Sequence, residues 1–204
     1  MKLFYAAASP FVRKVLVVAA ELGIDDRIER INAPTTPMKA DAALAEANPV
    51  AKLPTLLTDE GEALYDSGVI CEYLAAEAGN ATMLPPGGAA RWAVLRLHAL
   101  ANGLLDAAVL RRYEAAMRPE DKQWADWSEG QRLKVERALD ELERTADTLG
   151  REPTLGAIAV ACGLGYLDFR FAHEDWRQGR PKLAAWYDGG WAKRPSMAAT
   201  VPAG

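Results

Sequence analysis

The chain has 204 residues, a length that fits one or two domains. Half of its residues are hydrophobic and a quarter are charged, so it can bury a core of ordinary size. Its formal net charge is −4, and an acidic chain lacks the basic footprint that phosphate contacts require, which argues against nucleic-acid binding. The longest apolar run near the N-terminus, Val15 to Ala20, is too short for a membrane span. We therefore expect a cytoplasmic protein without a membrane partner.

Short strands and helices alternate over residues 1–79. Ser9 and Pro10 are typical of a helix start, with Ser as the N-cap and Pro at the first helical position, and Gly23 is typical of a helix end. Two apolar runs flank Asp59-Glu60-Gly61 and predict an antiparallel hairpin. The predicted order is β-α-β-α-β-β-α, made up of residues 3–5, 10–22, 28–31, 40–47, 55–57, 63–65 and 67–78.

Residues 80–88 predict a linker, because they carry no charge and contain Pro85-Pro86-Gly87-Gly88. After this linker the pattern predicts helices only, so residues 89–204 form an all-α domain. The apolar residues of 154–171 lie on all sides of the helix, which favours a buried central position. The four predicted helices cover residues 89–117, 123–149, 154–171 and 181–192.

Two hydroxyls near the start of the chain are candidates for chemistry. Ser9 is either a plain N-cap or a hydroxyl that donates to a bound thiolate, since the positive end of a helix favours an anion. Tyr5, on the first strand, offers a phenol as the rival, although a strand tyrosine is more often part of the core. Cys71 and Cys162 are far apart, in apolar helical contexts, and we expect buried reduced thiols. No metal-ligand spacing is present, so we expect no metal site.

Two features of residues 52–67 suggest a ligand. Pro54 stands at the entrance of a strand, where a cis bond would leave the backbone of Leu53 free to pair with an extended peptide, although a trans proline at an edge is the simpler reading. Asp66 and Ser67 open a helix, with Ser67 as the expected cap and Asp66 complementing the helix dipole. In the alternative interpretation, Ser67 at the helix N-terminus binds a ligand carboxylate and Asp66 binds a ligand ammonium.

The remaining polar and aromatic residues favour structural roles. We expect Arg13 and Lys14 to be solvated or in surface ion pairs, and His98 and His173 to be structural. Lys52 could meet a ligand carboxylate, but an exposed side chain is the simpler interpretation. A group of aromatic residues could line an apolar pocket at the domain boundary or simply belong to the core: Tyr113, Trp124, Trp127 and Tyr166.

Taken together, these motifs resemble the glutathione S-transferase family, and bacterial members of it in particular. The likeness covers nearly the whole chain in order, through five stretches: residues 9–14, residues 48–56, Asp66-Ser67 with residues 70–74, residues 155–159 and residues 163–170. One residue departs from the family pattern. Thr154 keeps the cap of the central helix, but Ala157 stands where the family usually has an acid, so the second hydrogen bond of the capping box is lost.

The resemblance implies a thioredoxin-like N-terminal domain, a cis-proline at Pro54 and a homodimer. It implies that Leu53 pairs with the cysteinyl part of glutathione and that Asp66 and Ser67 hold the γ-glutamyl end. Ser9 falls where serine- and cysteine-type members carry the residue that faces the sulfur. Residues 9–12 resemble a glutaredoxin-type site whose first cysteine position is serine.

The resemblance therefore implies a glutathione transferase. The enzyme would use glutathione as co-substrate, without a further cofactor, and would act on a small hydrophobic electrophile. Asn102 and Asp106 could approach the glutathione site of the second subunit. Two alternatives remain open: a glutathione-dependent reductase of disulfides or peroxides, and a non-catalytic scaffold with the same fold.

Overall fold

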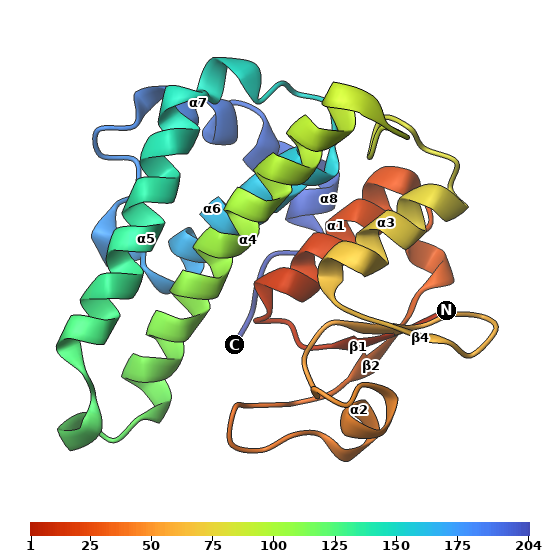
Figure 1. Cartoon of the computed structure of the whole chain (residues 1–204), viewed down its shortest axis with the longest axis horizontal. Coiled ribbons are helices and arrows are strands. Elements are labelled where there is room, and N and C mark those ends of the chain that lie inside the picture. The colour runs from red at the N-terminus through yellow and green to blue at the C-terminus, as the bar shows by residue number, and fades with distance from the viewer.

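The computed structural model describes all 204 residues and shows an N-terminal sheet with helices on both faces, joined to a helical half (Figure 1). The N-terminal half has the predicted order. Its elements are β1 (Lys2–Tyr5), α1 (Pro10–Leu22), β2 (Glu29–Asn32), α2 (Ala42–Ala47), β3 (Thr55–Leu57), β4 (Ala63–Leu64) and α3 (Ser67–Glu77).

The four strands form one sheet in the order β2-β1-β3-β4. β1 pairs in parallel with β2 and antiparallel with β3, and β3 pairs antiparallel with β4. Alternate residues of β1 therefore face opposite layers. Leu3 packs into the large core beneath α1 and α3, whereas Phe4 packs with Ala33 and Leu44 on the α2 side.

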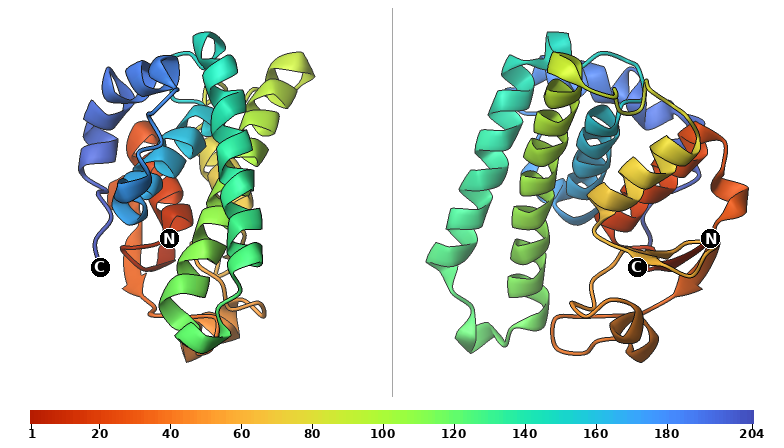
Figure 2. Two further views of the ribbon diagram at one scale, coloured as in Figure 1. Left: turned by 90° about the vertical axis from the view of Figure 1, so that its left-hand side faces the viewer. Right: turned by 45° about the vertical axis from the view of Figure 1, so that its right-hand side comes forward.

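The second half is entirely helical, as predicted. α4 (Gly88–Met117) and α5 (Ala125–Arg144) run side by side, and α6 (Leu155–Arg170) lies between α4 and α1 (Figures 1 and 2). α7 (Pro181–Asp188) and α8 (Pro195–Ala198) close the other side. Residues 155–167 of α6 are all buried, which confirms its central position. Thr154 caps this helix by accepting a hydrogen bond from the Ala157 N–H at 3.2 Å.

Two helices end earlier than the sequence predicts. α5 stops at Arg144 instead of residue 149, and a short 3₁₀ turn over Ala146–Thr148 follows it. α7 stops at Asp188 instead of residue 192, because Gly189 and Gly190 interrupt it before the 3₁₀ turn Trp191–Lys193. The Gly-Gly pair thus ends the helix.

α4 is long and apolar enough to cross a membrane by length and composition alone, although only a third of its apolar window is buried inside the structure. Core helices of soluble proteins pass the same test. Ala101, Leu105 and Ala108 face α6 and the core. Trp92 and Leu110, on the opposite side of the helix, are exposed.

Candidate active site

One edge of the sheet collects the residues that the sequence singled out. The register pairs Phe4 with Thr55 and Leu56 with Leu64, so the chain leaves β1, enters β3 and leaves β4 at the same edge. The loop before α1, the Leu53–Pro54 segment and the start of α3 therefore meet there. This edge places Ser9, Leu53, Pro54, Asp66 and Ser67 close together in space, although they span 59 positions of the sequence.

Ser9 lies at the N-terminal end of α1. Its Oγ accepts a hydrogen bond from the Val12 N–H at 3.3 Å, so Ser9 is the N-cap, and Pro10 is the first helical residue as predicted. Capping uses only an acceptor lone pair of the hydroxyl. The O–H proton remains free to donate to a ligand, at the positive end of the helix dipole. The capping role and the donor role of Ser9 are thus compatible.

The Leu53–Pro54 peptide bond is cis, as the resemblance implied. A buried hydrogen-bond network supports this loop. The Asn48 amide donates to the Lys52 carbonyl at 3.2 Å and to the Thr55 hydroxyl at 2.9 Å, and Thr55 in turn donates to the Lys52 carbonyl at 3.0 Å. Asn48 is buried, and this network shows that it holds the loop from inside.

The start of α3 differs in one respect from the prediction. Asp66, not Ser67, is the N-cap, because its carboxylate accepts from the Gly68 N–H at 2.9 Å. Ser67 is the first helical residue and is buried. The Tyr65–Asp66 peptide bond is also cis. Both side chains still lie at the helix N-terminus, where unpaired N–H groups favour a carboxylate ligand.

Lys14 is fully buried, which contradicts the prediction of a solvated side chain. Its ammonium lies 2.8 Å from the Nε2 of His98 and donates to the Asn102 Oδ1 at 2.8 Å. Burial lowers the pKa of Lys14, and the nearby charges of Asp66 and Asp106 oppose that shift. Burial and the Lys14 charge lower the pKa of His98 to about 4, so the imidazole is neutral and accepts from Lys14.

The Lys14–His98–Asn102 cluster lies directly behind the start of α3. A side-chain carbon placed on Gly68 would lie 3.1 Å from His98 and 3.2 Å from the Asp66 carboxylate, so these two groups adjoin the same glycine. Asp106, one turn beyond Asn102 on α4, is exposed. Partial desolvation raises the pKa of Asp106, while Lys52 and Lys14 act to lower it. Asn102 and Asp106 thus adjoin the site of their own chain, and their contact with a second subunit stays a prediction.

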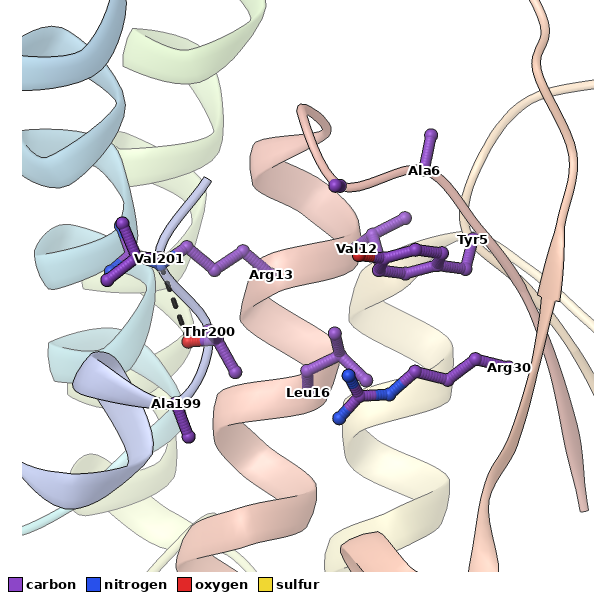
Figure 3. A pocket seen from close by; sticks show the side chains of 10 residues that line it. Tyr5, Ala6, Val12, Arg13, Leu16, Arg30, Ala199, Thr200 and Val201 are labelled. Carbon is purple, nitrogen blue, oxygen red and sulfur yellow. Dashed lines mark hydrogen bonds between the residues drawn. The ribbon is translucent and has the colours of Figure 1, made fainter. Parts of the chain in front are cut away.

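Arg13 is buried too, against expectation, and ties down the end of the chain. Its guanidinium donates to the Met197 carbonyl at 3.1 Å and to the Thr200 hydroxyl at 3.5 Å (Figure 3). Gly165 on α6 makes this possible, because a side-chain carbon there would lie 2.4 Å from the guanidinium. Arg13, Tyr5 and Arg30 line a small cavity of about 50 Å³ behind the start of α1.

Tyr5 is one of the residues that line this cavity. Its ring lies 5.9 Å from the guanidinium of Arg30, which belongs to β2 (Figure 3). β2 and β3 flank β1 on opposite sides. The phenol therefore lies with Arg30 and Val12 in this cavity, whereas Ser9 begins the helix at the ligand edge.

The aromatic residues that could have lined a single pocket are dispersed. Tyr166 is buried on α6 and Tyr113 is half-buried on α4, near the end of the helix. Trp124 is 63% exposed at the start of α5. Trp127 is half-buried on α5, and Tyr113 and Tyr166 lie near Arg112 and Arg170.

The two cysteines are buried and free, as predicted. Burial raises the pKa of Cys71 to about 12 and that of Cys162 to about 11, so neither is a thiolate at neutral pH. No group of three or more histidine, cysteine or acidic side chains comes together as metal ligands would. The need for no further cofactor stays a prediction.

A four-stranded mixed sheet with a cis-proline at one edge, followed by a bundle of helices, defines a two-part protein of the thioredoxin-like class. The comparisons with known proteins agree. The profile of the glutathione S-transferase N-terminal domain matches residues 8–77, and that of the C-terminal domain matches residues 125–189. The chain belongs to the glutathione S-transferase family.

Similar proteins cover the chain from end to end. The uncharacterized GST-like protein YibF of Escherichia coli (strain K12) is 38% identical, over 99% of this chain and 98% of its own. A glutathione transferase family member of Pseudomonas fluorescens Pf-5, solved with bound glutathione, is 46% identical with a TM-score of 0.96, covering 100% of this chain and 99% of that one. A structure from the same organism with bound S-(propanoic acid)-glutathione is 44% identical with a TM-score of 0.91, and both chains are fully covered.

Proposed function

We propose that the protein is a glutathione transferase that ionises the glutathione thiol and presents the thiolate to a small electrophile. The observation that carries the proposal is the meeting of three features at one sheet edge: the Ser9 helix end, the cis Leu53–Pro54 loop and the Asp66–Ser67 helix end. The relatives solved with glutathione and with S-(propanoic acid)-glutathione support it.

Each part of the tripeptide has a partner at this edge. Leu53 pairs its backbone with the cysteinyl residue, in a geometry that Pro54 fixes. Ser67 and the first N–H groups of α3 hold the γ-glutamyl carboxylate, and Asp66 accepts from the ammonium. The buried charge of Lys14 lies behind this helix start and favours the bound carboxylate electrostatically.

Ser9 is the residue that we assign to the chemistry. Its O–H donates to the sulfur, and this hydrogen bond and the positive end of α1 both favour the thiolate. The thiolate sulfur then forms a bond to the electrophilic carbon, while the electron pair leaves with a leaving group or moves onto an activated double bond. The orientation of Tyr5 toward Arg30 supports Ser9 over the phenol.

The reductase alternative has less support. A serine cannot form the mixed disulfide that thiol–disulfide exchange requires. Cys71 and Cys162 are buried with raised pKa values, so neither replaces it. The buried free thiols also fit a reducing, cytoplasmic compartment.

We further propose a homodimer. Trp92 and Leu110 on α4 are exposed on the side that faces away from the core, and Val69 on α3 is 49% exposed. A second copy that packs on this side would cover both helices in a two-fold contact. Light scattering should give twice the mass of the 22.1 kDa chain, and Leu110→Glu should give the monomer.

Glutathione calorimetry tests the proposed function. We expect binding at millimolar or lower glutathione, and weaker binding by Asp66→Asn. Absence of binding would rule out the transferase and favour the scaffold.

Assays of the wild type and Ser9→Ala with conjugation and disulfide substrates separate the two enzyme classes. We expect conjugation to fall about 10- to 1000-fold in Ser9→Ala, whereas disulfide reduction by the wild type at a higher rate than conjugation would favour the reductase.

A further inference from the structure

Two arginines near the ends of α4 and α6, Arg112 and Arg170, form no ion pair with an aspartate or glutamate side chain. Arg112 makes neither an ion pair nor a hydrogen bond. Arg170 stacks on the Phe169 ring at 3.9 Å and donates one N–H to the Gly204 carbonyl at 2.9 Å. A guanidinium has five N–H donors, so most of the donors of both residues remain free. The adjacent Arg111, by contrast, is paired with Glu174.

Arg112 occupies a position where the helix pattern calls for an apolar residue. Ala101, Leu105 and Ala108 are buried at spacings of four and three residues, and Arg112 follows them at the next step of four. α6 ends at Arg170, while α4 continues to Met117. Arg112 is therefore aimed at the end of α6 from the side of α4 that faces the interior.

Two tyrosines complete a group that we call the aromatic–arginine cluster: Arg112, Tyr113, Tyr166 and Arg170. Burial raises the pKa of Tyr166 to about 12, and the nearby cations Arg170 and Arg112 oppose that shift. α4 and α6 run in parallel, with Gly163 against Leu104 and Leu105, and this packing brings both guanidinium groups to the end of α6 that carries Tyr166. Half-buried cations and aromatic rings together offer a site for a planar or extended anion.

The cluster lies next to the loop that carries Ser9. Arg170 contacts Gly204, and a side-chain carbon placed on Gly204 would lie 3.8 Å from the Cβ of Ala8, the residue before Ser9. Figure 1 shows this end of the chain beside the start of α1. Tyr113 follows Asn102 and Asp106 on the stripe of α4 that faces the N-terminal half.

The acidic side chains around the cluster have other partners. Glu174 binds Arg111, and Asp168 accepts from Arg177 and from the Trp176 indole. Glu114 accepts from Arg118 and from the Trp124 N–H. These three carboxylates are thus engaged elsewhere and do not pair with Arg112 or Arg170.

We propose that the electrophile carries a carboxylate, and that Arg112 and Arg170 bind this carboxylate while the half-buried Tyr113 packs against the rest of the molecule. This inference rests on the proposed glutathione site, because the electrophile reaches the cluster from the sulfur. It narrows the substrate class from small apolar electrophiles in general to anionic ones.

Calorimetry with conjugates tests the inference without turnover. The ligands are glutathione and two conjugates, S-(carboxyethyl)glutathione and S-(para-carboxybenzyl)glutathione, whose carboxylates lie at different distances from the sulfur. The carboxamide of each conjugate is its neutral control. We expect at least one carboxylate to bind about 10-fold more tightly than its carboxamide. Arg112→Gln should reduce this ratio to near one, while Arg112→Lys should retain part of it.

Arg96→Gln is the matched control, since it removes the same charge from α4 at about 24 Å from Arg112. It should keep the wild-type ratio. If glutathione itself does not bind, the proposed function fails and this inference with it. If glutathione binds but neither carboxylate is preferred, or if Arg112→Gln keeps the preference, the anionic substrate class is wrong while the transferase proposal stands.

Discussion

Lys14 places a charge in the interior of the protein, and its neighbours determine what that costs. A buried ammonium is tolerated only where polar groups replace its water. Here the replacements are the neutral imidazole of His98 and the amide of Asn102. The ammonium can keep its charge only while His98 remains unprotonated, because two adjacent cations would repel each other.

The stability of the fold should therefore depend on the protonation of His98. Its pKa is about 4 in the folded protein and 6.5 in the unfolded chain, so the unfolded state binds the extra proton between these values. Stability is full above pH 6.5 and falls toward pH 4, by about 1.4 kcal/mol for each pH unit well inside this window. Urea denaturation at a series of pH values measures it.

His98→Gln should remove most of this slope, because the glutamine amide oxygen can accept from Lys14 and does not titrate. His173→Gln is the control, since His173 is 74% exposed. An equal loss of stability between pH 6.5 and 4.5 in the wild type and His98→Gln would show that another group causes it.

At the scale of elements, α6 determines how closely the helices approach. Gly156 lies against α4, where an added side-chain carbon would be 2.8 Å from the Val94 carbonyl and 3.0 Å from the Leu97 Cβ. Backbone contact of this kind cannot be relieved by a side-chain rotation. At Gly165 the same helix leaves room for the Arg13 guanidinium. One glycine of α6 thus allows contact with α4, and the other allows contact with Arg13.

Gly156→Ala should destabilise the fold by about 1–3 kcal/mol, because α4 and α6 must separate to admit the methyl group. Gly130→Ala is the matched control: Gly130 lies inside α5 and has no atom within 4 Å of the added carbon. There the substitution should stabilise by about 0.5–1 kcal/mol. Thermal denaturation of both variants gives the comparison, and a neutral Gly156→Ala would show that the helices are not held at this distance.

The elements and the ligand edge could be predicted from the sequence because they depend on local signals. The Ser9 cap, the Gly23 helix end and the hairpin before α3 all follow from residues within a few positions of one another. The burial of Arg13 and Lys14 could not be predicted in this way. It depends on α6 and α4 enclosing α1 from the second half of the chain, and on Gly165, Asn102 and His98 standing opposite the two cations.

For the whole molecule, the main finding is that the two halves share one core. A single cluster of 42 buried residues includes Leu3 and Val15 from the first half and Leu105 and Ile158 from the second. α1 packs against α3 on one side and α6 on the other. The linker also contributes, since Met83 is buried and its carbonyl accepts from the Leu155 N–H at 2.9 Å.

We therefore expect the two halves to unfold together. All six tryptophans lie between residues 92 and 191, so their fluorescence reports the helical half. In Cys162→Ala, thiol labelling of Cys71 reports the N-terminal half. The two probes should give the same denaturation midpoint, and separate midpoints would show independently stable domains.

The central claim is that this sheet edge binds glutathione and that Ser9 stabilises its thiolate. The most direct test is the pKa of the bound thiol, followed by the ultraviolet absorbance of the thiolate. A free thiol has a pKa of about 8.5. We predict a value at least one unit lower on the wild-type protein and a rise of about 1–2 units in Ser9→Ala. Bound glutathione that titrates like the free thiol, or identical curves for the two proteins, would contradict the account.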